Sequence, residues 1–399
     1  MKTNQFLIIV MLVSLVASHT CIAQIKFEEG SFAEIKAKAK KENKLIFVDC
    51  YTSWCGPCKW LAKNAFTNDT VAQFYNSNFI NASLDMEKGE GPTLAKQYNV
   101  IWYPTLLFIN GDGELVHRGS GSGSIPKFIQ LGKNAIIPEK QFATFDKKYK
   151  AGQRDPAFIA QYLAVFKKAY VDYKEQVNEY FNTQKETDLT SRQNWNIING
   201  FLTYEQSKTF NYLLKNEAAF AKAYTKDSVS DKIYSVYYDA GNDLIYTKKF
   251  DSVKYVQFQN EIKNSGFSRS GELLLNIDMT YFSKKKDYEN YAKTTVSYLS
   301  LYDKKNVDQL YYIVNNFYAN VKDKAMLAKA EQWAKEAYEI MPKDPEIIDA
   351  YACLLSVNEK KKDAVKLETE AIEILKSNPE TANSSYLDDY GKRIAEWSK

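Results

Sequence analysis

The chain has 399 residues and a nearly balanced charge, with 53 lysines and arginines against 49 aspartates and glutamates. The length predicts two or three domains, and the balanced charge gives no indication of nucleic-acid or anionic-membrane partners. Only two histidines are present, so a histidine-based zinc site or a Ser-His-Asp hydrolase is hard to build. We therefore expect no metal centre.

Residues 1–23 have the pattern of a cleavable signal peptide. Lys2 gives a positive start, residues 6–17 are nearly all apolar, and the small residue Ala23 favours cleavage after it. The apolar run is shorter than the about 20 residues of a spanning helix, and no second long apolar stretch follows. We expect a periplasmic or secreted protein with no stable membrane span after cleavage. An uncleaved anchor and a lipoprotein acylated at Cys21 are less favoured alternatives.

Residues 24–140 alternate between strand and helix patterns, which predicts an α/β domain. Ser31 and Glu34 have capping-box spacing and predict a helix that ends near Lys41. Residues 45–48 form a continuous apolar run, which predicts a strand buried on both faces. Further strands are predicted at 79–84, 105–109 and 114–117, and further helices after Cys55, at 93–98 and from Ile125. Asp112-Gly113 predicts a hairpin turn.

Residues 141–399 have a helical pattern, with apolar and aromatic residues spaced between lysine and glutamate faces. The run at 336–341 and the Pro-Glu pair at 345–346 recur 34 residues later, at 370–375 and 379–380. A helical period of this length resembles the tetratricopeptide repeat, so such repeats are expected at about 310–399. Tyrosines at helical spacing are interpreted as interhelical packing.

Cys55-Gly56-Pro57-Cys58 lies where a buried strand turns into a helix. The first thiol is thus placed at a helix N-terminus, where unpaired N–H groups and the helix dipole favour a thiolate. The second, one turn deeper, is suited to resolving a mixed disulfide. The alternatives are a structural disulfide or half of a zinc site, although Cys50 and Cys353 do not supply a second Cys-x-x-Cys pair.

The stretch from Trp54 to Lys59 resembles the thioredoxin active site, and Tyr103-Pro104-Thr105 resembles the cis-proline loop of thioredoxins. The resemblance covers about residues 26–137, and residues 66–69 look closer to the exported disulfide-interchange branch of the superfamily. It implies a thioredoxin-like α/β fold for the domain at 24–140. The helical pattern that follows predicts an all-α helical-hairpin domain at 141–399.

The resemblance also implies roles for individual residues. Cys55 attacks, Cys58 resolves, and Asp49 is a buried proton acceptor for Cys58; the alternative for Asp49 is a strand-end position near solvent. The bond before Pro104 is expected to be cis. The residues expected to contact substrate are Trp54, Gly56, Pro57, Tyr103 and Pro104.

Two departures from thioredoxins affect the expected site. Trp102-Tyr103 is bulkier than the pair that usually precedes the cis proline, and Asn81 stands where thioredoxins place a lysine beside the buried aspartate. Cys50 and Cys353 are expected in the core, and His117 is expected to be exposed on its strand.

The sequence therefore predicts an exported thiol-disulfide oxidoreductase that exchanges disulfides in client proteins, with an upstream electron donor or acceptor. No organic cofactor is needed, because the cysteine pair stores both electrons. Gly56-Pro57 resembles reducing thioredoxins, which favours the reductase direction. The alternative is an interaction or scaffold protein whose helical repeats bind a partner and whose thioredoxin-like domain is a redox sensor or a non-catalytic module.

Overall fold

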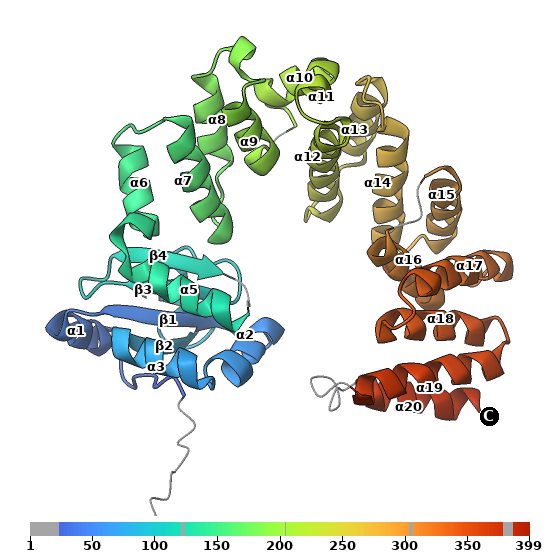
Figure 1. The fold of residues 1–399 in the computed structure, drawn as a ribbon, viewed down its shortest axis with the longest axis horizontal. Helices are drawn as coiled ribbons and strands as arrows, with labels where there is room; N and C mark the ends of the chain where they lie inside the picture. The colour runs from blue at the N-terminus through green and yellow to red at the C-terminus, as the bar shows by residue number, and fades with distance from the viewer. Residues whose placement is uncertain (1–23, 121–123, 204, 303–305, 378–385) are drawn as a thin grey trace, which may run out of the picture. The chain divides into compact units, whose positions relative to one another are not determined.

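The structure is a computed structural model that describes residues 24–120, 124–203, 205–302, 306–377 and 386–399 (Figure 1). The expected signal peptide, residues 1–23, lies outside the described residues. The chain divides into two compact units, residues 1–183 and 184–399. The last strand of the described residues ends at Ser120, so neither the change to all-helical elements nor the division into units falls at residue 140, and the domain boundary predicted there stays a prediction.

The first unit holds all four strands of the described residues and the helices that cover them. Its elements are α1 (Phe32–Glu42), β1 (Leu45–Tyr51), α2 (Gly56–Trp60), the π-helical turn η1 (Leu61–Ala65), α3 (Asp69–Asn78), β2 (Phe79–Asp85), α4 (Gly91–Gln97), β3 (Thr105–Ile109), β4 (Leu115–Ser120), α5 (Ile125–Ile136), the 3-10 turn η2 (Pro138–Lys140), α6 (Phe142–Lys150), α7 (Pro156–Lys168) and α8 (Lys174–Asn182).

The sheet has the order β2-β1-β3-β4, with β1 parallel to β2 and antiparallel to β3. The parallel pair is connected through α2, η1 and α3, the crossover that parallel strands need. In this register Asp49 lies directly opposite Ser83, and Phe47 lies opposite Asn81. The turn that carries Cys55 and Cys58 therefore follows the carboxyl end of β1, a central strand of the sheet.

Helices cover both faces of the sheet (Figure 1). Ile46, Val48 and Cys50 of β1 pack with α1 and α4, whereas Phe47 packs with η1, α3 and α5. Since successive side chains of a strand point to opposite faces, Asp49 belongs to the Phe47 face. The capping box of α1 is present: the Glu34 N–H donates to the Ser31 hydroxyl, and the Ser31 N–H donates to the Glu34 carboxylate.

The prediction that His117 is exposed is wrong. Its side chain is 5% exposed, because β4 continues to Ser120 and α6 packs against this strand. The Phe142 N–H at the start of α6 donates to His117 Nδ1 at 3.1 Å. Burial lowers the pKa of His117 to about 4, which keeps the ring nitrogen an acceptor. The sequence alone does not tell that a helix from beyond the α/β segment covers the hairpin.

The described residues of the second unit form helices only. They are the 3-10 turn η3 (Glu186–Asp188), α9 (Arg192–Phe201), α10 (Lys208–Lys215), α11 (Glu217–Ala223), α12 (Lys226–Tyr246), α13 (Ser252–Asn264), α14 (Ser270–Lys285), α15 (Tyr288–Leu301), α16 (Val307–Asn320), α17 (Lys324–Ile340), α18 (Pro345–Val357), α19 (Lys361–Ser377) and α20 (Tyr386–Trp397).

The two recurring runs fall at the ends of α17 and α19, so α17–α18 and α19–α20 are two successive helix pairs. Ala352, Ala364 and Ala371, which have the small-residue spacing of the repeat, are fully buried. The pairs are consistent with tetratricopeptide-like repeats, and membership of that family stays a prediction. The expectation that Cys50 and Cys353 are buried thiols is confirmed.

Candidate active site

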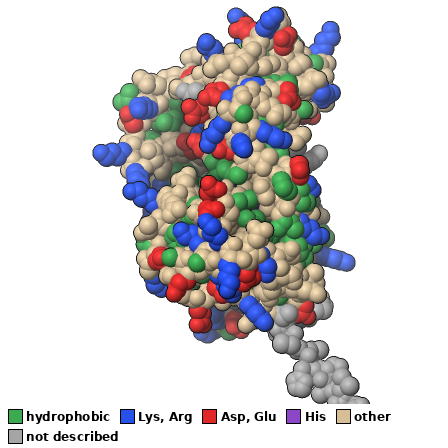
Figure 2. Space-filling view, turned by 90° about the vertical axis from the view of Figure 1, so that its left-hand side faces the viewer, with side chains coloured by type: hydrophobic (Ala, Val, Ile, Leu, Met, Phe, Trp, Pro, Cys, Tyr) green, Lys and Arg blue, Asp and Glu red, His purple; other side chains and the backbone are tan. Residues whose placement is uncertain are grey.

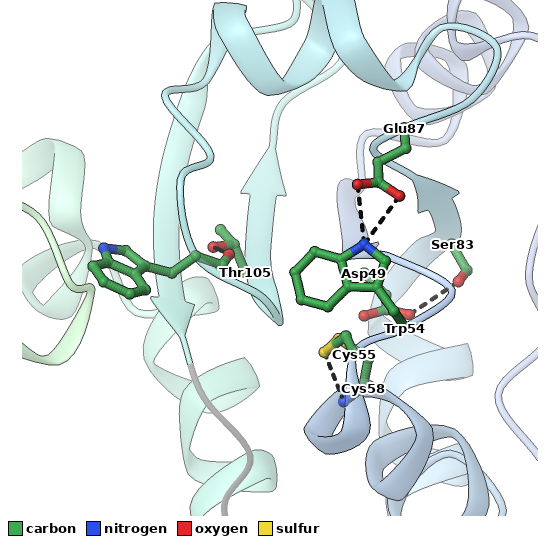
Figure 3. The surroundings of a disulfide bond; sticks show 8 residues. Asp49, Trp54, Cys55, Cys58, Ser83, Glu87 and Thr105 are labelled. Atoms are coloured by element: carbon green, nitrogen blue, oxygen red, sulfur yellow. Dashed lines mark hydrogen bonds between the residues drawn. A yellow bond between two sulfur atoms is a disulfide. The ribbon is translucent and has the colours of Figure 1, made fainter. Parts of the chain in front are cut away.

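Cys55 and Cys58 form a disulfide at the start of α2, with their Cα atoms 5.3 Å apart (Figure 3). Cys55 is the N-cap residue, and its sulfur accepts a hydrogen bond from the Cys58 backbone N–H at 3.1 Å. Pro57 lies in the first turn of α2. Backbone N–H groups have no partner within the helix at this position, so the missing N–H of proline costs no hydrogen bond. The helix terminus therefore stabilises negative charge on the Cys55 sulfur once the disulfide is reduced.

Both sulfur-bearing residues are covered in this oxidised state, Cys55 at 3% exposure and Cys58 at 5%. The sequence predicts that Cys55 is accessible to solvent and that Cys58 is shielded from it. In the disulfide form the two residues do not differ in exposure in this way. Gly56 and Pro57, between the two cysteines, are exposed. The Gly-Pro turn is therefore the part of the motif that is open to solvent.

Trp54 is held beside the disulfide by two neighbours from other parts of the chain. Its indole N–H donates to both carboxylate oxygens of Glu87, at 3.0 and 3.1 Å (Figure 3). Its ring also meets the Tyr103 ring edge-on, with the ring centroids 5.9 Å apart. The indole is still 66% exposed, so it offers an apolar surface next to Cys55. Glu87 is missing from the predicted site, although the carboxyl ends of parallel strands meet at one edge of the sheet.

The loop before β3 has the cis Tyr103–Pro104 bond that the resemblance implies. Pro104 is buried, and the Thr105 hydroxyl donates to the Trp102 carbonyl at 2.6 Å. Ile101 and Trp102 are 63% and 59% exposed. Exposed large apolar side chains on a loop next to the disulfide are typical of a protein-binding surface.

A buried arginine supports the start of this loop. The guanidinium of Arg118 on β4 donates to the carbonyls of Tyr98 and Asn99, just beyond α4, at 3.1 and 3.3 Å. Its burial lowers the pKa of the group. Arg118 is thus a positioning residue for the segment that leads to Tyr103, and the sequence does not indicate it.

Asp49 is buried, 4% exposed, on the sheet face that carries α2 and α3. The Ser83 hydroxyl donates to Asp49 Oδ2 at 2.9 Å, whereas Oδ1 has no hydrogen-bond partner among the described residues. Burial raises the pKa of Asp49 to about 7, and the Ser83 bond opposes this only in part. A carboxyl group with such a pKa can accept and release a proton near neutral pH.

Asp49 and Cys58 line one cavity of about 390 Å³. Cys58, Thr52 and Ser83 line it together with Asp49, and the Thr52 hydroxyl is buried without a hydrogen-bond partner in the described ranges. Apolar surface makes up most of the lining, but the side chains of Asp49, Thr52 and Ser83 give water polar partners there. A cavity of this size has room for water, which can carry a proton between groups that are not in direct contact. The alternative prediction, that Asp49 is a strand-end residue near solvent, does not agree with its burial. The acid-base role of Asp49 stays a prediction.

Asn81 stands where thioredoxins have a lysine beside the buried aspartate, but its side chain does not bond to Asp49. Its side-chain nitrogen donates to Asn76 Oδ1 at 3.1 Å and to the Lys26 carbonyl at 3.3 Å. The partner of Asp49 is Ser83, two residues further along β2. Ser83 and Thr52 are absent from the predicted site, and the strand register is the signal that would have indicated Ser83.

Within the described residues, no cluster of three or more histidine, cysteine, aspartate or glutamate side chains is arranged to hold a metal ion. Helices that could cross a bilayer are also absent from the described ranges, because none of these helices is both long and apolar enough.

The fold and the disulfide at α2 are those of a thioredoxin-like domain with a Cys-x-x-Cys pair. A family model described as thioredoxin-like matches residues 28–111. The thioredoxin of Chlorobaculum thiosulfatiphilum is 31% identical over 102 residues, which cover 26% of this chain and 87% of that protein. The chain therefore belongs to the thioredoxin-like family.

Other similarities cover a comparable share of the chain. The thiol:disulfide interchange protein DsbD of Yersinia pestis is 32% identical over 95 residues, which cover 23% of this chain but only 16% of DsbD. A solution structure from Bacteroides thetaiotaomicron, of a protein proposed to be a disulphide-isomerase, is 48% identical and covers 29% of this chain and 95% of that one, with a TM-score of 0.27.

Proposed function

We propose that this chain is an exported enzyme that reduces disulfides in client proteins. The observation that carries the proposal is the Cys55–Cys58 pair at the start of α2, next to a cavity that Cys58 shares with Asp49. The thioredoxin-like family supports thiol-disulfide chemistry at these cysteines. On the face drawn in Figure 2, basic and acidic side chains are interspersed, which fits protein clients better than a polyanion.

The reaction begins from the reduced pair. The Cys55 thiolate attacks one sulfur of a client disulfide, which forms a mixed disulfide and expels the other client sulfur as a thiolate. Asp49 takes the proton of Cys58 through the shared cavity. The Cys58 thiolate then attacks Cys55 Sγ, which releases the second client thiolate and closes the Cys55–Cys58 bond. The client gains two electrons, and an upstream dithiol donor returns two electrons to the chain.

Insulin reduction with dithiothreitol as electron donor tests this activity. We expect the full chain to accelerate precipitation of the insulin B chain, and Cys55→Ser to abolish the acceleration. Cys353→Ala, which removes a buried thiol of the second unit, is the matched control and should keep the activity. If the wild-type chain does not accelerate insulin reduction, the proposal that it is a disulfide reductase is refuted.

Clients are identified with Cys58→Ser, because this variant keeps the attacking thiol and lacks the group that resolves the mixed disulfide. We expect disulfide-linked adducts at Cys55 that dithiothreitol releases. Export is tested by N-terminal sequencing of the mature protein, which we expect to begin at Gln24.

One observation favours the alternative function, a helical interaction protein with a non-catalytic thioredoxin-like module. Cys55 is 3% exposed in the oxidised state, which leaves little of its sulfur open to an upstream donor. The insulin assay separates the two functions, since a non-catalytic module gives no turnover with dithiothreitol.

A further inference from the structure

The second unit has an open groove of about 950 Å³ between α12, α14, α15 and α16. Six of its lining residues are tyrosines. They are Tyr234, Tyr238, Tyr246, Tyr291, Tyr298 and Tyr312. The interpretation of the spaced tyrosines as interhelical packing does not hold for all of them, since Tyr312 is 73% and Tyr246 58% exposed. These rings leave amphipathic surface open to a ligand.

The groove is elongated along the helices. Its lining on α12 runs from Tyr234 to Tyr246, and its lining on α14 runs from Glu272 to Ser283. At 1.5 Å per helical residue the α12 stretch is about 18 Å long. An extended polypeptide of five or six residues spans about the same distance, at about 3.3 Å per residue.

Side-chain amides lie between the rings. The Asn276 amide nitrogen donates to the Tyr234 hydroxyl at 2.8 Å, and the Tyr298 hydroxyl donates to Gln309 Oε1 at 3.3 Å. The other side-chain atoms of these two amides, Asn276 Oδ1 and Gln309 Nε2, form no hydrogen bond within the described ranges. One acceptor and one donor are therefore available, which are the two groups that a peptide backbone requires.

The charges of the groove argue against an anionic ligand. Its lining contains one arginine, Arg269, and two carboxylates, Glu272 and Asp308. The Arg269 guanidinium is bound by Glu272 at 2.7 Å and by Asp231 at 2.5 Å, so its charge is already compensated. An uncharged or basic ligand matches this lining.

We propose that this groove binds an extended, unfolded client segment of five or six residues, uncharged or basic. The amides hold the backbone of the segment, and the tyrosine rings cover its side chains at a low cost in conformational entropy. The identity of the occupant rests on the proposed function, in which the substrates are proteins. A client held on the same chain as Cys55 reaches it at a raised effective concentration.

Binding is measured on the full chain carrying Cys55→Ala and Cys58→Ala, so that no client is captured covalently. The probe is fluorescently labelled lysozyme, reduced and alkylated with iodoacetamide, which is a basic unfolded protein whose blocked thiols carry no charge. We expect saturable binding by anisotropy, and we expect Tyr312→Ala combined with Gln309→Ala to weaken it at least about tenfold. Tyr170→Ala, an exposed tyrosine of the first unit, is the matched control and should leave the affinity unchanged.

Absence of binding, or an affinity that the groove substitutions do not change, would overturn the inference. Displacement of the probe by maltohexaose would also overturn it, because it would make a neutral oligosaccharide the occupant. Insulin reduction by the wild-type chain is measured in parallel. Normal insulin reduction without probe binding would contradict only the proposed binding groove. Probe binding without insulin reduction would contradict the proposed enzyme activity and would leave the groove as a binding site.

Discussion

Both units bury carboxyl groups near a cysteine, but they surround them differently. In the first unit, Asp49 has one hydroxyl partner, Ser83, and borders a cavity that it shares with Cys58. In the second unit, Asp349 and Glu368 both bind Arg393, and the Cys353 thiol lies 3.7 Å from Asp349.

Burial raises the pKa of the carboxyl group in both places, to about 7 for Asp49 and to about 8 for Glu368. The difference lies in the partners. Arg393 opposes the effect of burial on Asp349 and connects α18, α19 and α20, so the charges hold helices together. Among the described residues, Asp49 forms no ion pair with a cation, and its hydrogen-bond partner is the neutral Ser83 hydroxyl. We propose that this lack of a paired cation suits Asp49 to proton transfer with Cys58.

Removal of the cation from the second unit should have the largest effect. Arg393→Met leaves two buried carboxyl groups unpaired, and we expect a loss of about 3–5 kcal/mol in the free energy of unfolding. Urea denaturation measures it. Lys392→Met, on the exposed neighbour that pairs with Asp389, should change stability by less than about 0.5 kcal/mol. Equal effects of the two variants would show that the cluster does not hold the helices.

Asp49→Asn should separate stability from catalysis. The pKa of Asp49 is about 7 in the folded chain and about 3.9 in an unfolded one, so the folded state holds the additional proton between these values. Wild-type stability should therefore fall by up to about 4 kcal/mol as pH rises from about 4 to about 7, and Asp49→Asn should lack this loss. Urea titrations of both proteins at a series of pH values measure the difference.

The same variant should resolve mixed disulfides more slowly by about a hundredfold at pH 7, because Cys58 loses its proton acceptor. Stopped-flow measurement of the release of a labelled client thiol gives this rate. A variant that is stabilised at high pH but resolves at the wild-type rate would leave Asp49 buried without an acid-base role.

Ser83→Ala should have a smaller effect at the same carboxyl group. The hydroxyl of Ser83 lowers the pKa of Asp49, so its loss should move the pH profile of mixed-disulfide resolution upward. The lost hydrogen bond should cost about 1 kcal/mol of stability. Ser77→Ala, at an exposed serine of α3, is the control. A pH profile that stays in place would rule out Ser83 as a tuning residue.

Glu87→Ala should have the smallest effect on stability, below about 0.5 kcal/mol, because the bond to the Trp54 indole is exposed. Release of the indole should raise KM for insulin more than it lowers kcat, since Trp54 is proposed to contact substrate and does not react. Steady-state kinetics provides both constants, and a fall in kcat alone would argue against a binding role.

Much of the first unit could be predicted from local sequence. The apolar run at 45–48, the capping box at Ser31 and the Cys-Gly-Pro-Cys turn each depend on neighbouring residues, and each appears in the structure as predicted. Ser83, Glu87 and Arg118 depend on strand register and on loops that meet in space, so spacing along the chain does not indicate them. The prediction that His117 is exposed was wrong for the same reason, since the helix that buries this side chain begins at Phe142.

The second unit shows more plainly which contacts local sequence cannot predict. Asp349, Glu368 and Arg393 lie on three helices, and each looks like part of a solvated charged face when its own helix is read alone. Only the packing of α18, α19 and α20 brings them together. The tyrosine groove likewise combines side chains from four helices.

The central claim is that Cys55 ionises readily, and the alkylation rate of this thiol tests it most directly. Reduced Cys58→Ala protein is treated with iodoacetamide over a range of pH, and labelling at Cys55 is followed by mass spectrometry. The buried Cys50 and Cys353 serve as internal controls that should stay unlabelled. We predict a midpoint at about pH 7 or below. A midpoint near the about 8.5 of an ordinary cysteine, or no labelling of the folded protein, would contradict the claim.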